Sequence, residues 1–113
     1  MVNKAYVPRK GDIVWLNFTP QAGHEQRGRR LGLVMSSDSY NRSGLMLVCP
    51  ITSSIKGYPF EVRIKTEDGT NGVVLADHLK NQDWKARKVQ FQGKAHKDTM
   101  EMVRNIIAAL LIK

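Results

Sequence analysis

The residues best suited to chemistry gather in one polar segment, residues 19–30, which reads Thr-Pro-Gln-Ala-Gly-His-Glu-Gln-Arg-Gly-Arg-Arg. It contains a histidine, the carboxylate of Glu25 and three arginines, the last of which is Arg30. A carboxylate can accept a proton, and a guanidinium can hold negative charge through a planar fork of donors. So long a connection in a small domain is usually functional or mobile. The segment therefore predicts acid–base chemistry assisted by arginine.

Other catalytic chemistries find no support in the sequence. It has neither the Gly-Lys-Ser/Thr of a phosphate-binding loop nor a Gly-x-Ser-x-Gly elbow. One cysteine and three scattered histidines do not match a zinc-binding spacing. Cys49 lies in an apolar run with no histidine nearby, which favours a small buried side chain over a nucleophile. We therefore expect neither a metal ion nor a cofactor.

The charge balance points to an anionic partner. Eighteen Lys and Arg against ten Asp and Glu leave a net charge of +8, dispersed over several short clusters. Such a surface attracts nucleic acid, although simple solvated faces have the same composition. No apolar run is long enough to span a bilayer, and the N-terminus lacks a secretory signal. We expect one domain over residues 1–113, in a reducing cytoplasm and without membrane contact.

Strand patterns dominate the elements that must position these residues. Short apolar or alternating runs predict strands at residues 12–18, 31–35, 45–51, 60–65, 73–76 and 89–92. The period changes near the C-terminus, where Asp98 and Glu101 have capping-box spacing ahead of one apolar helical face. The sequence therefore predicts a mainly β protein, a strongly bent antiparallel sheet or small barrel with a C-terminal helix.

Five motifs in order resemble the MazF/PemK family of toxin endoribonucleases. They are Gly-Asp-Ile-Val-Trp at 11–15, Glu-Gln-Arg-Gly-Arg-Arg at 25–30, Pro-Ile-Thr-Ser at 50–53, Lys-Gly-Tyr-Pro-Phe at 56–60 and Val-Leu-Ala-Asp at 74–77. The resemblance implies a homodimer of SH3-like barrels of the CcdB/PemK type. It also implies metal-independent, sequence-selective cleavage of single-stranded RNA by the ribose 2′-hydroxyl, leaving a 2′,3′-cyclic phosphate and a 5′-hydroxyl. The implied partner is an acidic, MazE-like antitoxin.

The resemblance also assigns a catalytic set. Arg30 aligns with the family's catalytic arginine and would stabilise the crowded phosphorane. Thr52, at a strand end, would hydrogen-bond the phosphate. Glu25 is the candidate general base, and Asp77 is the alternative, since plasmid-borne relatives are thought to use an acidic residue near that position. The family usually reads Arg-Pro-Ala or Arg-Pro-Val where this chain reads Arg30-Leu31-Gly32, so the backbone at the arginine is freer here.

Candidate RNA contacts surround that set. Ser53, Lys56 and His78 align with positions that touch bases or phosphates in related toxins, and His78 follows Asp77 directly.

Trp15 and Asn17 share a predicted strand face, where an indole can stack on a base and an amide can bind its edge. A tryptophan in an apolar strand is also a common core residue, so both interpretations of Trp15 stand.

Two other functions fit parts of the pattern. A gyrase-poisoning toxin shares the fold but relies on an exposed tryptophan near its C-terminus, whereas this chain ends Ala-Ala-Leu-Leu-Ile-Lys. A catalytically silent RNA-binding barrel would explain the charge and the aromatic residues without Glu25 and Arg30.

Overall fold

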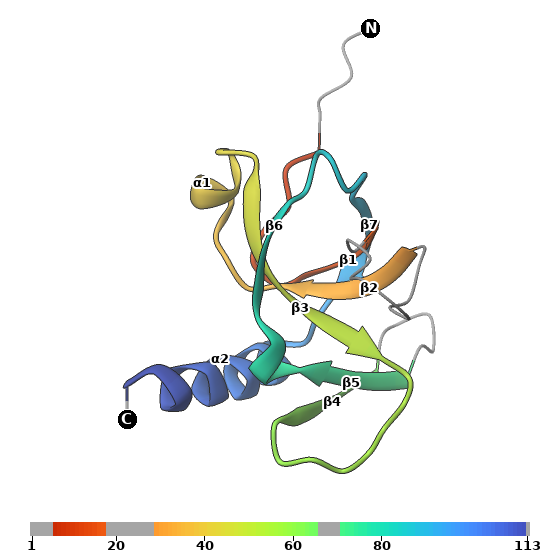
Figure 1. Cartoon of the computed structure of the whole chain (residues 1–113), viewed down its shortest axis with the longest axis vertical. Coiled ribbons are helices and arrows are strands. Elements are labelled where there is room, and N and C mark those ends of the chain that lie inside the picture. Colours follow the sequence, from red (N-terminus) through yellow and green to blue (C-terminus); the bar gives the residue numbers. More distant parts are fainter. Residues whose placement is uncertain (1–5, 18–28, 66–70, 113) are drawn as a thin grey trace, which may run out of the picture.

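The computed structural model describes residues 6–17, 29–65 and 71–112, and Glu25 lies outside these ranges. Figure 1 shows the elements along the chain. They are β1 (Asp12–Asn17), β2 (Arg29–Val34), α1 (Asp38–Asn41), β3 (Leu45–Thr52), β4 (Glu61–Lys65), β5 (Asn71–Leu75), the 3₁₀ turn η1 (Ala76–His78), β6 (Lys80–Asp83), β7 (Gln90–Lys94) and α2 (Lys97–Ile112).

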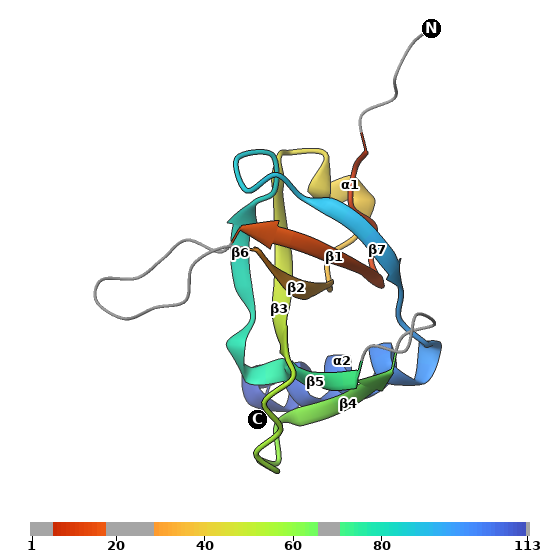
Figure 2. The same cartoon turned by 90° about the vertical axis from the view of Figure 1, so that its right-hand side faces the viewer.

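The strands form one antiparallel sheet in the order β4-β5-β3-β2-β1-β7, with β6 paired to β3 outside this path. The first half of β3 pairs with β6 and its last residues pair with β5, so the sheet turns around this strand. A register shift in β1 between Ile13 and Val14 adds curvature against β7. Figure 2 shows the curled sheet with α2 across one end, and the predicted fold class is confirmed.

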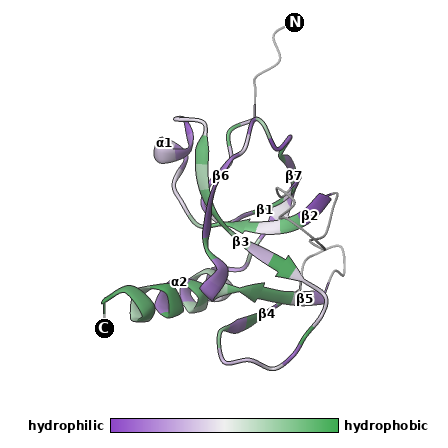
Figure 3. Ribbon diagram, in the orientation of Figure 1, coloured by the Kyte–Doolittle hydropathy of each residue, from purple (hydrophilic) through white to green (hydrophobic). Residues whose placement is uncertain are grey.

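Strand alternation divides the core into two clusters. One cluster, which includes Ile13, Leu33 and Cys49, meets Val103 of α2. The other, which includes Val14, Val34 and Val48, is closed by Trp84 from the turn between β6 and β7. The apolar segments of β1, β2, β3 and β5 stand out in Figure 3. No helix in the described ranges is long and apolar enough to cross a membrane.

Asp12 of the first motif is a structural carboxylate. It is 1% exposed and accepts hydrogen bonds from the Tyr6 hydroxyl, the Arg9 N–H at 3.0 Å and Lys94 Nζ at 2.8 Å. Burial, with this carboxylate beside it, raises the pKa of Tyr6 above its usual range. Asp12 thereby joins the N-terminal segment to β7.

The structure differs from the sequence prediction at β6, α1, α2 and β4, and by one or two residues at the ends of other strands. β6 and α1 were not predicted, because Lys80–Asp83 has no apolar alternation and α1 is a single turn capped by Ser37. α2 begins at Lys97, so Asp98 lies inside its first turn rather than before it. β4 begins after Phe60, whose side chain is exposed.

This chain has Leu31-Gly32 where the resembled family usually has Pro-Ala or Pro-Val. Packing explains the glycine at Gly32. A Cβ there would lie 2.7 Å from Val48 Cγ2 and 3.2 Å from Leu16 Cδ2. These distances are too short for ordinary contact, so glycine leaves room for the larger side chain at Val48.

Gly32→Ala is therefore expected to lower the free energy of unfolding by about 1–2 kcal/mol through overpacking. In a Val48→Ala background the same change should cost less than about 0.5 kcal/mol, because the obstructing methyl is gone. Urea denaturation of the four proteins measures both values. An equal cost in the two backgrounds would show that Val48 is not the obstacle.

Candidate active site

The register of β2 and β3 brings Arg30 and Thr52 together. Leu31 pairs with Ile51, so the next step along the antiparallel ladder sets Arg30 opposite Thr52. Both side chains are half-buried. Thr52 Oγ1 accepts a hydrogen bond from the Ser54 N–H at 3.1 Å. That bond uses a lone pair of the hydroxyl and leaves its proton available for a ligand oxygen.

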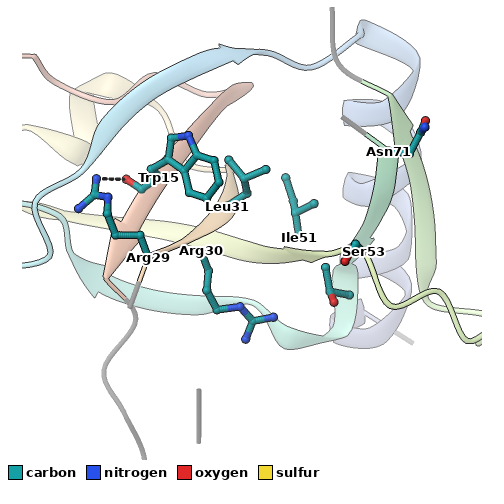
Figure 4. A pocket seen from close by; sticks show the side chains of 8 residues that line it. Trp15, Arg29, Arg30, Leu31, Ile51, Ser53 and Asn71 are labelled. Carbon is teal, nitrogen blue, oxygen red and sulfur yellow. Dashed lines mark hydrogen bonds between the residues drawn. The ribbon is translucent and has the colours of Figure 1, made fainter. Parts of the chain in front are cut away.

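A cavity of about 350 Å³ opens on one side of this pair, and we call it the Trp15 pocket (Figure 4). Its lining residues are Trp15, Arg29, Arg30, Leu31, Ile51, Thr52, Ser53 and Asn71. Figure 4 shows Trp15 and Asn71 at opposite ends, with Leu31 and Ile51 between them. The pocket therefore combines an apolar floor and an aromatic wall with cationic and hydroxyl groups at the rim.

A second cavity of about 400 Å³, the His78 pocket, opens on the other side. It is lined by Arg30, Thr52, Ser54, Lys56, Tyr58, Phe60, Glu61, Leu75, Asp77 and His78. Tyr58 is 61% exposed and Phe60 is 38% exposed. Exposed aromatic rings beside a cation are suited to stacking on flat, polar ligands.

Glu61 shapes the loop that carries Lys56. Its carboxylate accepts hydrogen bonds from the Lys56 N–H at 3.2 Å and the Gly57 N–H at 2.9 Å. Gly57 has a φ of 80°, which a residue without Cβ adopts readily. Glu61 thereby fixes the backbone of the loop beside the pocket.

Asp77 and His78 reach the same pocket from η1. His78 Nε2 lies 3.8 Å from Asp77 Oδ1, and both side chains are exposed. Beneath them Cys49 is fully buried, with Sγ 3.9 Å from the Ala76 carbonyl oxygen. Burial, and secondarily the negative charge of Asp77, raises the pKa of the Cys49 thiol to about 12. The predicted burial of Cys49 is confirmed.

Trp15 combines both roles that its sequence context left open. The half-buried indole packs against the first core cluster and also forms a wall of the pocket. Its Nε1–H donates to Gln92 Oε1 of β7 at 2.8 Å, which holds the orientation of the ring. Asn17, in contrast, lines neither pocket, and its Oδ1 accepts a hydrogen bond from Arg29 Nη1 at 3.3 Å.

The structure thus gathers most of the predicted site residues around one junction. Arg30 and Thr52 line both pockets, Trp15 and Ser53 line one, and the others line the second. Asn17 lines neither pocket, and Glu25 lies outside the described ranges. The following polar or aromatic lining residues were not assigned a role from the sequence: Arg29, Ser54, Tyr58, Phe60, Glu61 and Asn71. Of these, Arg29 lies in the Glu-Gln-Arg-Gly-Arg-Arg motif, and Tyr58 and Phe60 lie in the Lys-Gly-Tyr-Pro-Phe motif, so these two motifs gave a signal for them.

Within the described ranges, no three His, Cys, Asp or Glu side chains converge as metal ligands do. The charged groups of the two pockets are instead Arg29, Arg30, Lys56, Glu61 and Asp77, with His78 beside them. A cationic junction between two partly apolar pockets is suited to a phosphate with a flat ring on either side.

Comparisons with known proteins identify related chains. The family model described as "PemK-like, MazF-like toxin of type II toxin-antitoxin system" matches residues 9–111. The endoribonuclease toxin MazF of Escherichia coli K12 is 37% identical over 107 residues, which cover 94% of this chain and 96% of that protein. The endoribonuclease toxin ChpB of the same organism is 38% identical, with 89% of this chain and 90% of that protein covered.

A crystal structure of MazE-MazF from Deinococcus radiodurans is similar to this chain throughout. The TM-score is 0.86 at 52% identity, and the match covers 95% of this chain and 97% of the other. An endoribonuclease from a mycobacterial species matches with a TM-score of 0.73 at 17% identity, which shows the shared fold alone.

Proposed function

Because this chain belongs to the family of PemK-like, MazF-like toxins of type II toxin–antitoxin systems, we propose that it cleaves single-stranded RNA sequence-selectively and without a metal ion. It is an endoribonuclease toxin. The single observation that carries the proposed chemistry is the position of Arg30 and Thr52, which line both pockets. A phosphate bound there has room for one nucleotide on either side.

The reaction is an internal transfer of the phosphoryl group. The 2′-oxygen of the ribose forms a bond to phosphorus while the bond from phosphorus to the 5′-oxygen breaks. The departing 5′-oxygen takes up a proton, from the protonated base or from water, so the products are a 2′,3′-cyclic phosphate and a 5′-hydroxyl end. Arg30 holds the non-bridging oxygens as negative charge accumulates, and the Thr52 hydroxyl donates a hydrogen bond to the same phosphate.

A carboxylate removes the proton of the 2′-hydroxyl. Glu25 precedes Arg30 by five residues, and Asp77 lines the His78 pocket together with Arg30 and Thr52. Each group is a carboxylate, which can serve as general base when it lies within hydrogen-bond reach of the proton. His78, 3.8 Å from Asp77, takes part in RNA binding beside it.

The remaining candidate residues bind the RNA. The Trp15 indole stacks on one base and Ser53 binds its edge or phosphate, while Lys56 contacts the backbone on the other side. Asn17 acts less directly than the sequence suggested, since its amide oxygen accepts a hydrogen bond from Arg29.

The toxin acts in the cytoplasm as a homodimer of single-domain chains and is neutralised by an acidic antitoxin. The solved structures that are similar to this chain include a MazE-MazF complex. The end of α2 leaves Leu110, Leu111 and Ile112 between 50% and 80% exposed. An apolar surface of this kind is suited to a shared interface between subunits.

The test is cleavage of a long unstructured RNA by the purified protein in excess EDTA, with the ends of the products mapped. We expect discrete cuts with cyclic phosphate and 5′-hydroxyl ends, which also identify the motif. Ends with 5′-phosphate, or cleavage that requires added Mg²⁺, would contradict the mechanism. A folded protein that binds RNA without cutting it would favour the silent RNA-binding barrel, and a protein that neither binds nor cuts RNA would favour the gyrase poison.

The same assay identifies the general base. Glu25→Gln and Asp77→Asn are compared with wild type over a pH series. The variant without the base is expected to lose the rise in kcat with pH that ionisation of a carboxylate produces, whereas the other variant keeps it. A rise retained by both variants would exclude both carboxylates.

A further inference from the structure

A cluster of cations that adjoins the Trp15 pocket has no part in the proposed reaction. It consists of Lys85, Arg87 and Lys88 in the turn between β6 and β7, together with Arg29 at the start of β2, and we call it the turn patch. Lys85, Lys88 and Arg29 are exposed and Arg87 is half-buried. Figure 3 shows this turn and the start of β2 as strongly hydrophilic segments.

Within the part of the chain that the structure describes, no carboxylate neutralises the charge of the turn patch. Among the described residues, no Asp or Glu oxygen lies within 4.0 Å of a cationic nitrogen of the patch. The carboxylate of Asp83, at the end of β6, instead accepts the Ala86 N–H at 3.0 Å. Four adjacent cations without a paired anion attract an anionic polymer.

The turn patch is joined to the Trp15 pocket through Arg29, which also lines that pocket. Arg29 Nη2 donates to the Lys88 carbonyl oxygen at 2.7 Å and to Gln90 Oε1 at 3.0 Å. The Asn17 N–H donates to the Arg87 carbonyl oxygen at 2.9 Å, so β1 holds the turn from the other side. The cations therefore continue directly from the rim of the pocket.

The turn is also rigidly built. Trp84 is 5% exposed, and its Nε1–H donates to the Asn41 carbonyl oxygen at 2.7 Å. Lys85 Nζ lies 5.6 Å from the centre of the Trp84 ring. Lys88 has a φ of 54°, a left-handed conformation that lysine seldom adopts, and the bond from Arg29 helps to hold it. The backbone that carries these cations is thus held by packing and hydrogen bonds, so it need not reorganise when an anion binds.

From these observations we propose that the turn patch binds phosphates of the RNA strand beyond the nucleotides held in the two pockets. This inference rests on the proposed RNA cleavage and adds a sequence-independent binding surface to it. The patch contributes affinity for long RNA, whereas the pockets choose where the strand is cut. Single-strand binding of this kind combines a basic track with stacking sites, and the Trp15 pocket lies at one end of the track.

The test compares a short RNA that fills only the two pockets with a long RNA that carries the same mapped motif. Both are made with 2′-O-methyl ribose, so binding is measured by fluorescence anisotropy without cleavage. The variant is Lys85→Gln with Lys88→Gln, which leaves Arg29 and Arg87 in place. The matched control is Lys97→Gln with Arg104→Gln, two exposed cations of α2 that change the net charge equally.

We expect the turn variant to weaken binding of the long RNA on the order of 10-fold and to leave binding of the short RNA unchanged. The dependence of log K on log salt concentration for the long RNA should become less steep by about 1.4, because each phosphate contact on a single strand contributes about 0.7. The α2 control should change neither slope nor length preference.

Unchanged long-RNA binding, or an equal loss for both lengths, would overturn the proposal. If the turn variant instead resists inhibition by an acidic antitoxin while it binds long RNA normally, the patch belongs to that partner and the proposal is wrong. The binding readout separates this proposal from the cleavage mechanism, since uncleavable RNA can reveal the patch whatever the products of the cleavage assay are.

Discussion

Arg30→Ala is expected to lower kcat for RNA cleavage by about 10²–10³-fold. The guanidinium lies at the junction of the two pockets opposite Thr52, where the negative charge of the phosphorane would accumulate. Its interaction strengthens as that charge develops, so the loss falls on kcat rather than on KM. Single-turnover cleavage of an RNA with the mapped motif measures the effect directly.

Two comparisons separate this role from a general loss of charge. Arg30→Lys keeps the charge but lacks the planar fork of donors, so it should recover only part of the rate. Arg42→Ala removes an exposed arginine, which is paired with Asp38 at 3.4 Å and lines neither pocket, and this variant should cleave RNA like wild type. Wild-type activity in Arg30→Ala would contradict the assignment of the junction as the catalytic centre.

Asn41→Ala is expected to lower the free energy of unfolding by about 3 kcal/mol. The Asn41 side chain is fully buried, and its Nδ2 donates to the Pro8 carbonyl oxygen at 2.8 Å and to the Ser36 carbonyl oxygen at 3.0 Å. Its Oδ1 accepts from the Ser36 hydroxyl. Alanine leaves these buried groups without their partner, and each unsatisfied group costs about 1–3 kcal/mol.

Urea denaturation at a fixed protein concentration measures this loss. Asn81→Ala is the matched control, because Asn81 is exposed and its Nδ2 donates to the exposed Tyr40 hydroxyl at 3.1 Å rather than to a buried group. The control should change stability by less than about 0.5 kcal/mol. A similarly small effect in Asn41→Ala would mean that water or a shift of the α1 turn replaces the lost hydrogen bonds.

The elements predicted correctly are those whose information is local. Alternation along residues 60–65 predicted the buried side chains of Val62 and Ile64 in β4. The helical period after residue 98 predicted α2 and the buried side chain of Val103. Periods of 2 and 3.6 arise from the backbone itself and can be recognised without knowledge of the neighbours.

β6 is a strand that local sequence patterns did not predict. Lys80–Asp83 is polar, and only the Gln82 side chain is buried, so neither period is visible in its composition. It becomes a strand because the first half of β3 offers an unpaired edge whose backbone groups it satisfies. The pairing partner, rather than the segment's own residues, decides its structure.

Residue patterns were enough to predict the fold class, the C-terminal helix and, through five ordered motifs, the family to which the chain belongs. Which residues share a site became clear from the folded arrangement. The β2–β3 register sets Arg30 opposite Thr52, and Gln92 orients the Trp15 indole from 77 positions along the chain. Likewise, the cations of the β6–β7 turn meet Arg29 only through long-range hydrogen bonds. Local periodicity encodes individual helices and strands. A site depends instead on the pairing registers between strands, and residues far apart in the sequence determine those registers jointly.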